Sequence, residues 1–447
     1  MQAGALDLPP RPGVFWRDEG AAASARPLDP DVAVAHFASL AALTEHALAE
    51  RAESRATWLA VRAEAARLDA VSAAMWPTLT GQISFTHSRA LSSSGNPVPI
   101  LDRYGPSLGL AYVLYDFGGR ASGIEAQRYR LIASLLSSNR ALQDVVAEVE
   151  TAYYALLVQQ AQVDALSELE VSLAASLDAA EARLRGGLAS RADGLRARAA
   201  LAETQLARLA AERDRAKAEA GLKQAAAIAQ TRPLALDWKV EPPPEIEAAD
   251  LLADLLNEAQ RQRPDLAALE AAAAGARADA ARARAARWPT LSLAASTGRT
   301  FFLDDARIPS TSYSLGLNLS MPLFDGGRLA AEARAAERDA ERMQADAEAR
   351  LGEIGRAVAE AYLDVRHAQA QRTGLAIQLE SATESAQAAE ARYGAGVGSL
   401  LELLTAQASL ARARQTAAQA DAEWLAAFSR LNHALGRPPG ASVASPP

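Results

Sequence analysis

Residues 313–328, YSLGLNLSMPLFDGGR, decide the fold. The odd positions from Tyr313 to Leu323 are all apolar, whereas the even positions from 314 to 320 are small or polar. Because successive side chains of a strand point to opposite faces, this period of two predicts a strand with one apolar face. The pattern ends at Asp325-Gly326-Gly327, and an Ala-, Glu- and Arg-rich stretch of helical character follows. One strand therefore leads directly into a long helix.

The same arrangement occurs earlier in the chain, which indicates an internal duplication. Residues 106–120, PSLGLAYVLYDFGGR, again combine an alternating strand with a glycine pair. The motif WPTL occurs at 76–79 and again at 288–291, an offset of 212 positions (288 − 76). We align Gly118 with Gly326, an offset of 208 (326 − 118). A pattern that recurs at nearly constant spacing is the sequence signature of a repeat.

Each repeat is predicted to contain a helix, a β-hairpin, a very long helix, a glycine-containing turn and a second long helix. The first repeat, 31–230, is expected to have a helix at 31–74 interrupted between 49 and 54, strands at 78–88 and 106–116 around a loop at 88–105, and helices at 119–185 and 191–229. The second repeat, 250–436, is expected to have a helix at 250–286, strands at 290–300 and 312–323, and helices at 327–392 and 399–435. We expect an irregular leader at 1–30, a Pro-rich linker at 231–249 and a tail at 437–447.

Composition excludes several classes of function. The net charge is −8, and basic residues alternate with acidic ones along the predicted helices, so nucleic-acid binding has no electrostatic footprint. The chain has no cysteine, which excludes disulfides, thiolate metal sites, a cysteine nucleophile and a lipidated N-terminal cysteine. The five histidines have no metal-ligand spacing, and we find no nucleophile–base arrangement. We therefore predict no enzyme activity, no catalytic residue, no metal and no cofactor.

The predicted strands fit a membrane. No apolar run approaches the roughly 20 residues of a transmembrane helix. The first residues, MQAGALDLPPRPG, lack the basic and apolar regions of a signal peptide, and we expect a mature chain, a truncated chain or a misplaced start. Strands of about ten residues with one apolar face match transmembrane β-strands. Four strands cannot close a barrel, and lipid does not tolerate open sheet edges, so other copies must close it; three copies would supply twelve strands.

The long helices have apolar stripes with two interpretations. Residues 399–435 show two stripes, one from Leu404 to Leu425 and one from Leu403 to Leu431. A helix in the wall of a hollow cylinder contacts two neighbours and needs two stripes, whereas a helix in a solid bundle needs one broad stripe. Alanine-rich stripes also fit a compact bundle, because alanine is the best helix former. The helix at 191–229 is predicted to have one coiled-coil stripe, formed by Leu195, Ala199, Ala202, Leu206 and Leu209.

The duplication and the segments YDFGGR, FDGGR, GGLASRADGL and YGAGVGSLLELL resemble the TolC family of outer-membrane channel proteins, over residues 31–436. The resemblance implies a fold that is mainly α with β. It implies a homotrimer whose 12-stranded outer-membrane β-barrel, with four strands per protomer, continues into a long α-helical coiled-coil barrel across the periplasm. The implied partners are a periplasmic adaptor (membrane fusion) protein, an inner-membrane RND or ABC-type transporter and outer-membrane lipid.

The function implied by the resemblance is the outer-membrane duct of a tripartite efflux pump, which exports small molecules passively. One alternative is the outer-membrane component of a type I protein secretion system. Drug, metal and polypeptide cargo all fit such a duct, because specificity belongs largely to the transporter. A soluble coiled-coil scaffold is an alternative of a different class, but a long apolar strand face would aggregate in water.

The resemblance also implies roles for the two helix–turn–helix tips. Asp193 and Glu402 would place six carboxylates at the periplasmic entrance of a trimer, a cation-favouring ring. Carboxylates at these positions are equally explained by stabilisation of the helix N-terminus. Tyr393 occupies the position of a residue that helps to hold the tip closed. The implied adaptor-docking turns contain Gly186, Gly187, Leu188, Gly394, Gly396 and Val397.

Two further features lie where the predicted strands meet the helices. Transitions from strand to helix are predicted at Gly118, Gly119, Gly326 and Gly327. Trp76 and Trp288 precede the first strand of each hairpin, where a tryptophan either sits at the membrane interface or packs in the helix-to-strand junction.

Overall fold

We describe the fold from a computed structural model of the chain, which covers residues 34–89, 100–236, 251–303 and 308–437 together with Ser93, Gly95 and Pro97. The predicted leader at 1–30, most of the predicted linker and the tail beyond 437 lie outside the described residues.

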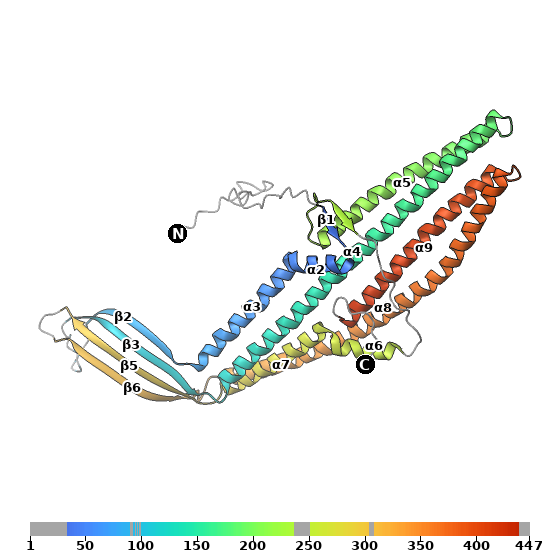
Figure 1. Ribbon diagram of the computed structural model, residues 1–447. Helices are drawn as coiled ribbons and strands as arrows, with labels where there is room; N and C mark the ends of the chain where they lie inside the picture. The colour runs from blue at the N-terminus through green and yellow to red at the C-terminus, as the bar shows by residue number, and fades with distance from the viewer. Residues whose placement is uncertain are drawn as a thin grey trace.

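The molecule is elongated, with a β-sheet at one end and long helices that run away from it (Figure 1). The sheet is antiparallel, in the order β2-β3-β5-β6, and contains β2 (Thr78–Ser88), β3 (Leu101–Tyr115), β5 (Thr290–Phe302) and β6 (Ser310–Ser320). The two longest helices, α4 (Gly119–Arg185) and α8 (Arg328–Gly394), each have 67 residues, about 100 Å at the helical rise. Each turns back at its far end into α5 (Arg191–Ala225) or α9 (Leu400–Leu435).

Several boundaries differ from the sequence-based prediction. β3 begins at Leu101, inside the stretch expected to be a loop, because its first residues continue the ladder with β2. The helix predicted to begin at 31 begins only at Leu40, because Ala35–Phe37 form β1, which pairs in parallel with β4 (Leu234–Leu236). Its predicted interruption between 49 and 54 is confirmed, since α2 (Leu40–Glu50) and α3 (Ala52–Ser72) are separated at Arg51. β4 lies in the stretch predicted as a linker, so non-local pairing overrides local pattern at both places.

The helix predicted at 250–286 is also divided, into α6 (Leu251–Gln262) and α7 (Pro264–Ala285). Proline has no N–H and is tolerated in the first turn of a helix, so Pro264 starts α7. The helix predicted to end at 229 ends at Ala225, because Ala227 adopts a left-handed conformation with φ of 57°.

At the strand-to-helix transitions, the two repeats correspond at an offset one residue larger than the alignment of Gly118 with Gly326 gives. Gly118 and Gly327 each precede a long helix with φ of 86°, and they are 209 positions apart (327 − 118). The preceding positions, Phe117 and Gly326, also have positive φ. The alignment of Gly118 with Gly326 is therefore wrong, and Gly119 is the first residue of α4. Left-handed backbone at these two positions turns strand into helix.

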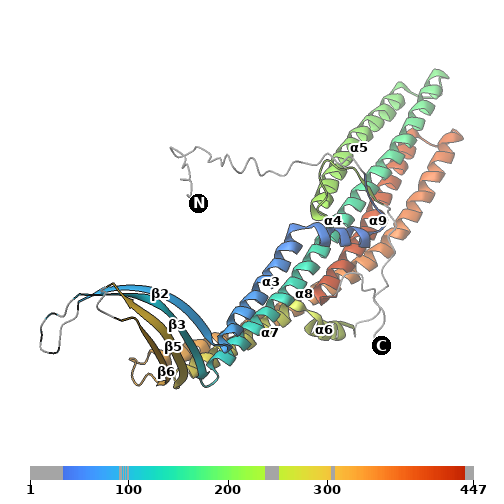
Figure 2. The ribbon, with the colours of Figure 1, turned by 60° about the vertical axis from the view of Figure 1, so that its left-hand side comes forward.

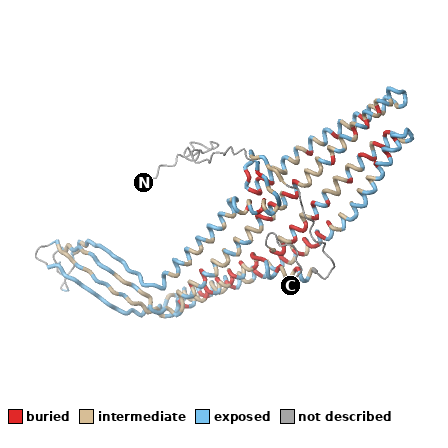
Figure 3. The backbone as a smooth tube through the Cα atoms, in the orientation of Figure 1, coloured by how far each residue is buried: buried red, intermediate tan, exposed pale blue. Residues whose placement is uncertain are grey.

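Each repeat has a core of its own, and the buried residues concentrate along the helices rather than in the sheet (Figure 3). The first core surrounds Tyr153 and the second surrounds Tyr362, which are equivalent positions (362 − 153 = 209). The α9 helix packs on both α8 and α4: Trp424 lies in the second core and Leu425 packs against the first. The two stripes predicted on this helix thus contact two neighbours.

The stripe predicted on α5 does not pack inside the chain. Leu195, Leu206 and Leu209 are 57%, 70% and 56% exposed. The buried residues on the upper part of α5 are instead Ala197 and Thr204, which lie on a different face.

Duplicated arginines join the short and long helices in each repeat. Arg51 lies at the break before α3 and Arg263 at the break before α7. Each donates from Nη1 to a carbonyl at the end of the returning helix, Arg51 to Ala225 at 3.2 Å and Arg263 to Ala434 at 3.0 Å. The two carbonyls are again 209 positions apart (434 − 225). A cation at a helix C-terminus satisfies orphan carbonyls and complements the helix dipole.

The second of these joints is the more buried. Arg263 is only 4% exposed and forms two hydrogen bonds with Asp265, at 2.9 and 2.6 Å. Burial alone would raise the pKa of the Asp265 carboxyl, but hydrogen bonds from Arg263 and Arg350 outweigh it and hold this pKa well below its usual range. The pair therefore stabilises the fold above the ordinary carboxyl pKa of about 4, and its contribution is lost as the pH falls through the depressed folded-state value.

We expect Arg263→Ala to lower the free energy of unfolding by about 3 kcal/mol, because it leaves the buried Asp265 carboxylate with one partner fewer. Arg51→Ala should cost about 1 kcal/mol, since the carboxylates of Glu53 and Glu148 are 63% and 50% exposed. Denaturant unfolding followed by circular dichroism measures both. Equal losses for the two variants would contradict this difference in burial.

Candidate functional site

The sheet has one apolar and one hydroxyl-rich face. Cross-strand pairing places Leu291 beside Leu319 and Leu293 beside Leu317 on one face, and Ser296 beside Ser314 on the other. The apolar face is bare within the chain, where its most exposed large side chains are Leu79, Ile83, Phe85, Tyr313, Leu315, Leu317 and Leu319, each at least 63% exposed. Monomeric soluble proteins rarely expose apolar surface of this extent, so this face needs a partner or a lipid environment.

Both outer strands of the sheet have an unpaired edge. In the described chain β2 pairs with β3 and β6 pairs with β5, so each outer strand has one hydrogen-bonded side. Rows of free N–H and C=O groups are a template for pairing with another chain. None of the described helices is long and apolar enough to cross a membrane.

Aromatic side chains gather where the sheet meets the helices. Trp288 stacks on Phe117 with ring centroids 5.5 Å apart, and Phe117 meets Tyr115 edge-on at 4.8 Å. Trp288 nevertheless stays 56% exposed, and Trp76 is 74% exposed. Trp288 therefore packs in the junction and also presents a face to the surroundings, which combines the two interpretations of these tryptophans.

At the opposite end of the molecule, the first tip joins α4 to α5. Gly187, with φ of 74°, donates to the carbonyl of Leu184 at 3.0 Å, and Leu188 donates to the carbonyl of Arg183 at 2.8 Å. This is the Schellman arrangement, in which a left-handed glycine closes a helix C-terminus. Leu188 is 82% exposed at the apex.

The second tip repeats this backbone. Gly396, with φ of 80°, donates to the carbonyl of Tyr393 at 3.1 Å, and Val397 donates to that of Arg392 at 3.0 Å. Val397, the counterpart of Leu188, is 73% exposed. Both tips thus present one bare apolar side chain on a rigid turn. Gly186 and Gly394, by contrast, lie at helix ends with no positive φ.

The two acidic tip residues have different partners. Ser190 and Asp193 form a reciprocal capping box, in which the Asp193 carboxylate accepts from the Ser190 hydroxyl at 2.7 Å and from its N–H at 3.1 Å. These hydrogen bonds lower the pKa of Asp193, so it is ionised at neutral pH. Glu402 instead accepts from Arg392 at 2.7 Å. Asp193 therefore caps its helix, whereas Glu402 closes its own hairpin.

The sequence did not predict the residue that joins the two tips. The Arg183 guanidinium lies 4.1 Å from the centroid of the Tyr393 ring and donates to the carbonyls of Tyr393 and Gly394, the latter at 3.1 Å. Tyr393 itself is 7% exposed, in a cluster with Leu400 and Leu403. Arg183 and Arg392 are equivalent (392 − 183 = 209), and an arginine three residues before each turn is the signal that could have identified them.

The described residues contain no group of three or more His, Cys, Asp or Glu side chains placed to hold a metal ion.

Comparisons with known proteins agree with this geometry. The model of the outer membrane efflux protein family matches residues 43–227 and 255–437. Protein CyaE of Bordetella pertussis is 32% identical over 371 residues, which cover 81% of this chain and 76% of that protein. The toluene efflux pump outer membrane protein TtgI of Pseudomonas putida is 28% identical over 380 residues, covering 81% and 77%. The alkaline protease secretion protein AprF of Pseudomonas aeruginosa is 28% identical over 346 residues, covering 75% and 70%.

Solved structures show the same fold. The outer-membrane channel OprN superposes with a TM-score of 0.76 at 25% identity, with 89% of each chain covered. The outer membrane protein VceC of Vibrio cholerae gives a TM-score of 0.75 at 20% identity, covering 89% of this chain and 96% of that one.

We expect Arg183→Ala to loosen the end of α8, because the carbonyls of Tyr393 and Gly394 lose their cationic donor. Amide hydrogen exchange at the second tip should become several-fold faster. Arg185→Ala is the matched control, because within the described part of the chain this neighbouring arginine forms no hydrogen bond or ion pair with the second tip, and the change should leave the exchange unaltered. Equal exchange in wild type and Arg183→Ala would show that Arg183 does not hold the two tips together.

Proposed function

The chain belongs to the outer membrane efflux protein family, and from this premise we propose that three copies form one continuous duct through the outer membrane and across the periplasm. The chain is an outer-membrane channel component that extends into the periplasm, and it is not an enzyme. The soluble coiled-coil scaffold is thereby excluded. Its partners are those of efflux and secretion systems, an adaptor and an inner-membrane transporter.

The observation that carries this proposal is the bare apolar face of a sheet with two open edges. A transmembrane sheet must satisfy all its backbone groups internally, so the β6 edge of one copy pairs with the β2 edge of the next until a closed barrel forms. Three copies supply twelve strands, within the range of known outer-membrane barrels. The hydroxyl-rich face then lines the water-filled interior.

The tips form the periplasmic entrance in this proposal. The exposed Leu188 and Val397, presented on equivalent rigid turns, provide repeated apolar contacts for a periplasmic adaptor. Asp193 and Glu402, whose side chains are 29% and 42% exposed, supply the carboxylates of a cation-favouring ring. The Arg183–Tyr393 contact holds the two hairpins of one copy together at this entrance.

A second candidate function, export of a polypeptide in a type I secretion system, is favoured by the similarity to AprF over three quarters of the chain. The two functions use the same duct and differ in the transporter below it. Neighbouring genes for an adaptor and a pump would indicate efflux, whereas genes for an ABC transporter and a secreted substrate would indicate secretion.

Purification tests the duct directly. We expect the protein to require detergent for extraction, to run as a heat-stable trimer and to form conducting pores in planar bilayers. A monodisperse protein that is soluble without detergent would overturn the proposal.

The carboxylate ring has its own test. The double variant Asp193→Asn with Glu402→Gln keeps hydrogen-bonding groups but removes six charges per trimer, so the reversal potential in a salt gradient should shift towards zero. Asp193→Ala with Glu402→Ala should shift it equally and also remove the N3 half of the capping box, at a cost of about 0.5 kcal/mol. If neither variant changes the reversal potential, Asp193 serves only as part of a helix cap and Glu402 only as the partner of Arg392.

A further inference from the structure

Equivalent helices of the two repeats differ in how much of their surface is buried. The difference indicates that a helix of the first repeat lacks a neighbour that its equivalent in the second repeat has. Helix α7 has nine buried residues, whereas α3, its equivalent in the first repeat, has none. The reason is position: α7 packs on both α4 and α8, while α3 packs on α4 and lies at the edge of the helical layer (Figure 2). Since α3 is the equivalent of α7 and α8 the equivalent of α4, the counterpart of the contact between α4 and α7 would join α8 to α3. Within the described residues of one chain this contact is not made, so one side of α3 stays open.

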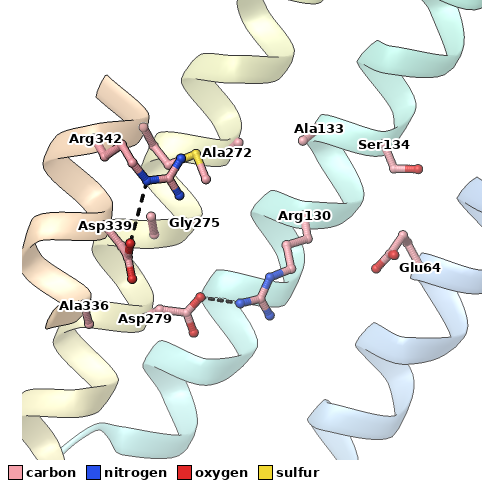
Figure 4. Close-up of a pocket in the computed structure, with 12 residues that line it drawn as sticks. Glu64, Arg130, Ala133, Ser134, Ala272, Gly275, Asp279, Ala336, Asp339 and Arg342 are labelled. Carbon is pink, nitrogen blue, oxygen red and sulfur yellow. Dashed lines mark hydrogen bonds and ion pairs between the residues drawn. The ribbon is translucent and has the colours of Figure 1, made fainter. Parts of the chain in front are cut away.

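The contact between α4 and α7 centres on an ion pair. Arg130 on α4 pairs with Asp279 on α7, close to Gly275, where an added Cβ would lie 3.3 Å from Tyr129 (Figure 4). Figure 4 shows the four helices in the order α3, α4, α7, α8, with Asp339 on α8 and Glu64 on α3 at the two ends. Residues of all four line one groove of about 460 Å³.

The repeat offsets identify the equivalent pair. WPTL and the arginines at the helix breaks relate α3 to α7 by 212 positions (263 − 51), so the equivalent of Asp279 is Arg67 (279 − 212). The long helices are related by 209 positions, so the equivalent of Arg130 is Asp339 (130 + 209). The pair is again one arginine and one aspartate, with the charges exchanged.

We propose that Arg67 of one copy pairs with Asp339 of the next, and that this charge-exchanged pair fixes the helical contact between copies. The proposal rests on the assembly of several copies into a duct. In the single chain both side chains are accessible, Arg67 at 63% and Asp339 at 69% exposure, with ion pairs to Glu64 and Arg342 on their own helices. Asp279 likewise keeps a pair with Arg282 on its own helix while it binds Arg130, so the two kinds of contact coexist.

A second set of residues, farther along the helices, points to the same neighbour. On α4, Tyr154 is 9% exposed in the first core, the cluster against which Leu425 of α9 packs. Its equivalent on α8, Leu363 (154 + 209), is 61% exposed. The exposed Leu195 of α5 is equivalent to Leu404 of α9 (195 + 209), which packs against a buried cluster that includes Ala180 of α4. Helix α9 thus covers α4, but the equivalent surface of α8 has no covering helix in the described chain. Because α5 is the equivalent of α9, α5 of the next copy would cover this surface.

Exchange of the charges also rejects wrong pairings. If α8 docked on α7 of another copy in the equivalent register, Asp339 would face Asp279. If α3 took the place of α7 beside α4, Arg67 would face Arg130. Like charges at a helix contact disfavour both arrangements, while the intended contact brings opposite charges together. The contact within the chain, α4 with α7, and the equivalent contact between copies, α8 with α3, can thus share one geometry without being confused with each other.

Charge reversal tests the pair in the full-length, detergent-extracted protein. Arg67→Asp and Asp339→Arg should each raise the monomer fraction of a dilution series at least several-fold, because each places like charges at three contacts per trimer. The double variant Arg67→Asp with Asp339→Arg should restore the wild-type fraction. Glu341→Arg is the matched control: it replaces an acidic residue by arginine two positions away, on the opposite side of α8, where Glu341 lines a separate groove between α7 and α8 of its own chain, and it should leave the trimer intact.

Cross-linking provides a measurement that does not depend on destabilisation. Because the chain has no cysteine, Arg67→Cys with Asp339→Cys introduces the sole thiol pair, and a short bis-methanethiosulfonate reagent should give covalent trimers. Arg67→Cys with Glu341→Cys should give far fewer. If neither charge reversal changes the stability of the trimer and the cysteine pair gives no cross-linked product, the Arg67–Asp339 pair is wrong. The proposed duct would not be affected by this result. A wild-type protein that is monomeric and forms no pores would overturn the duct itself.

Discussion

The structure depends on one constraint, the backbone hydrogen bonding of a four-stranded sheet with an apolar face. In lipid, free N–H and C=O groups at a sheet edge are too costly to leave unpaired, and in water the apolar face would aggregate. A single copy of this chain satisfies neither condition, because β2 and β6 each have one unpaired side. The proposed assembly of several copies would meet both conditions.

The helices also have surfaces that a single copy leaves uncovered, and these surfaces pack through side chains rather than through backbone hydrogen bonds. Within the chain, α4 covers α7 and α9, but the equivalent surfaces of α3 and α5 in the first repeat remain open. A duplicated sequence naturally produces such a chain with complementary ends, since the last long helix lacks the neighbours that the first one has. The open edges of the sheet and the open sides of the helical layer would therefore both be covered by another copy of the chain.

Rigidity lies in the turns and joints between the long helices. Left-handed residues at the strand-to-helix transitions and at the tips fix the direction of the chain where a helix begins or ends. Arg51 and Arg263 tie each returning helix to the break that starts α3 or α7. Helices of about 100 Å pack mainly through alanine, so a few charged and glycine positions set their register.

The sequence by itself determined the duplication, the one-sided strands, the long helices and the glycine turns, because all of these depend on local periodicity and backbone preference. It could not predict β1 and β4, whose pairing joins residues about 200 positions apart in the chain, or the exact equivalence of Gly118 with Gly327, which needs dihedral angles. Only the tertiary structure decided that Arg183 reaches Tyr393, that Asp193 caps its own helix while Glu402 binds Arg392, and that the stripe on α5 stays open. These are choices of partner, and a partner is set by which helices lie side by side.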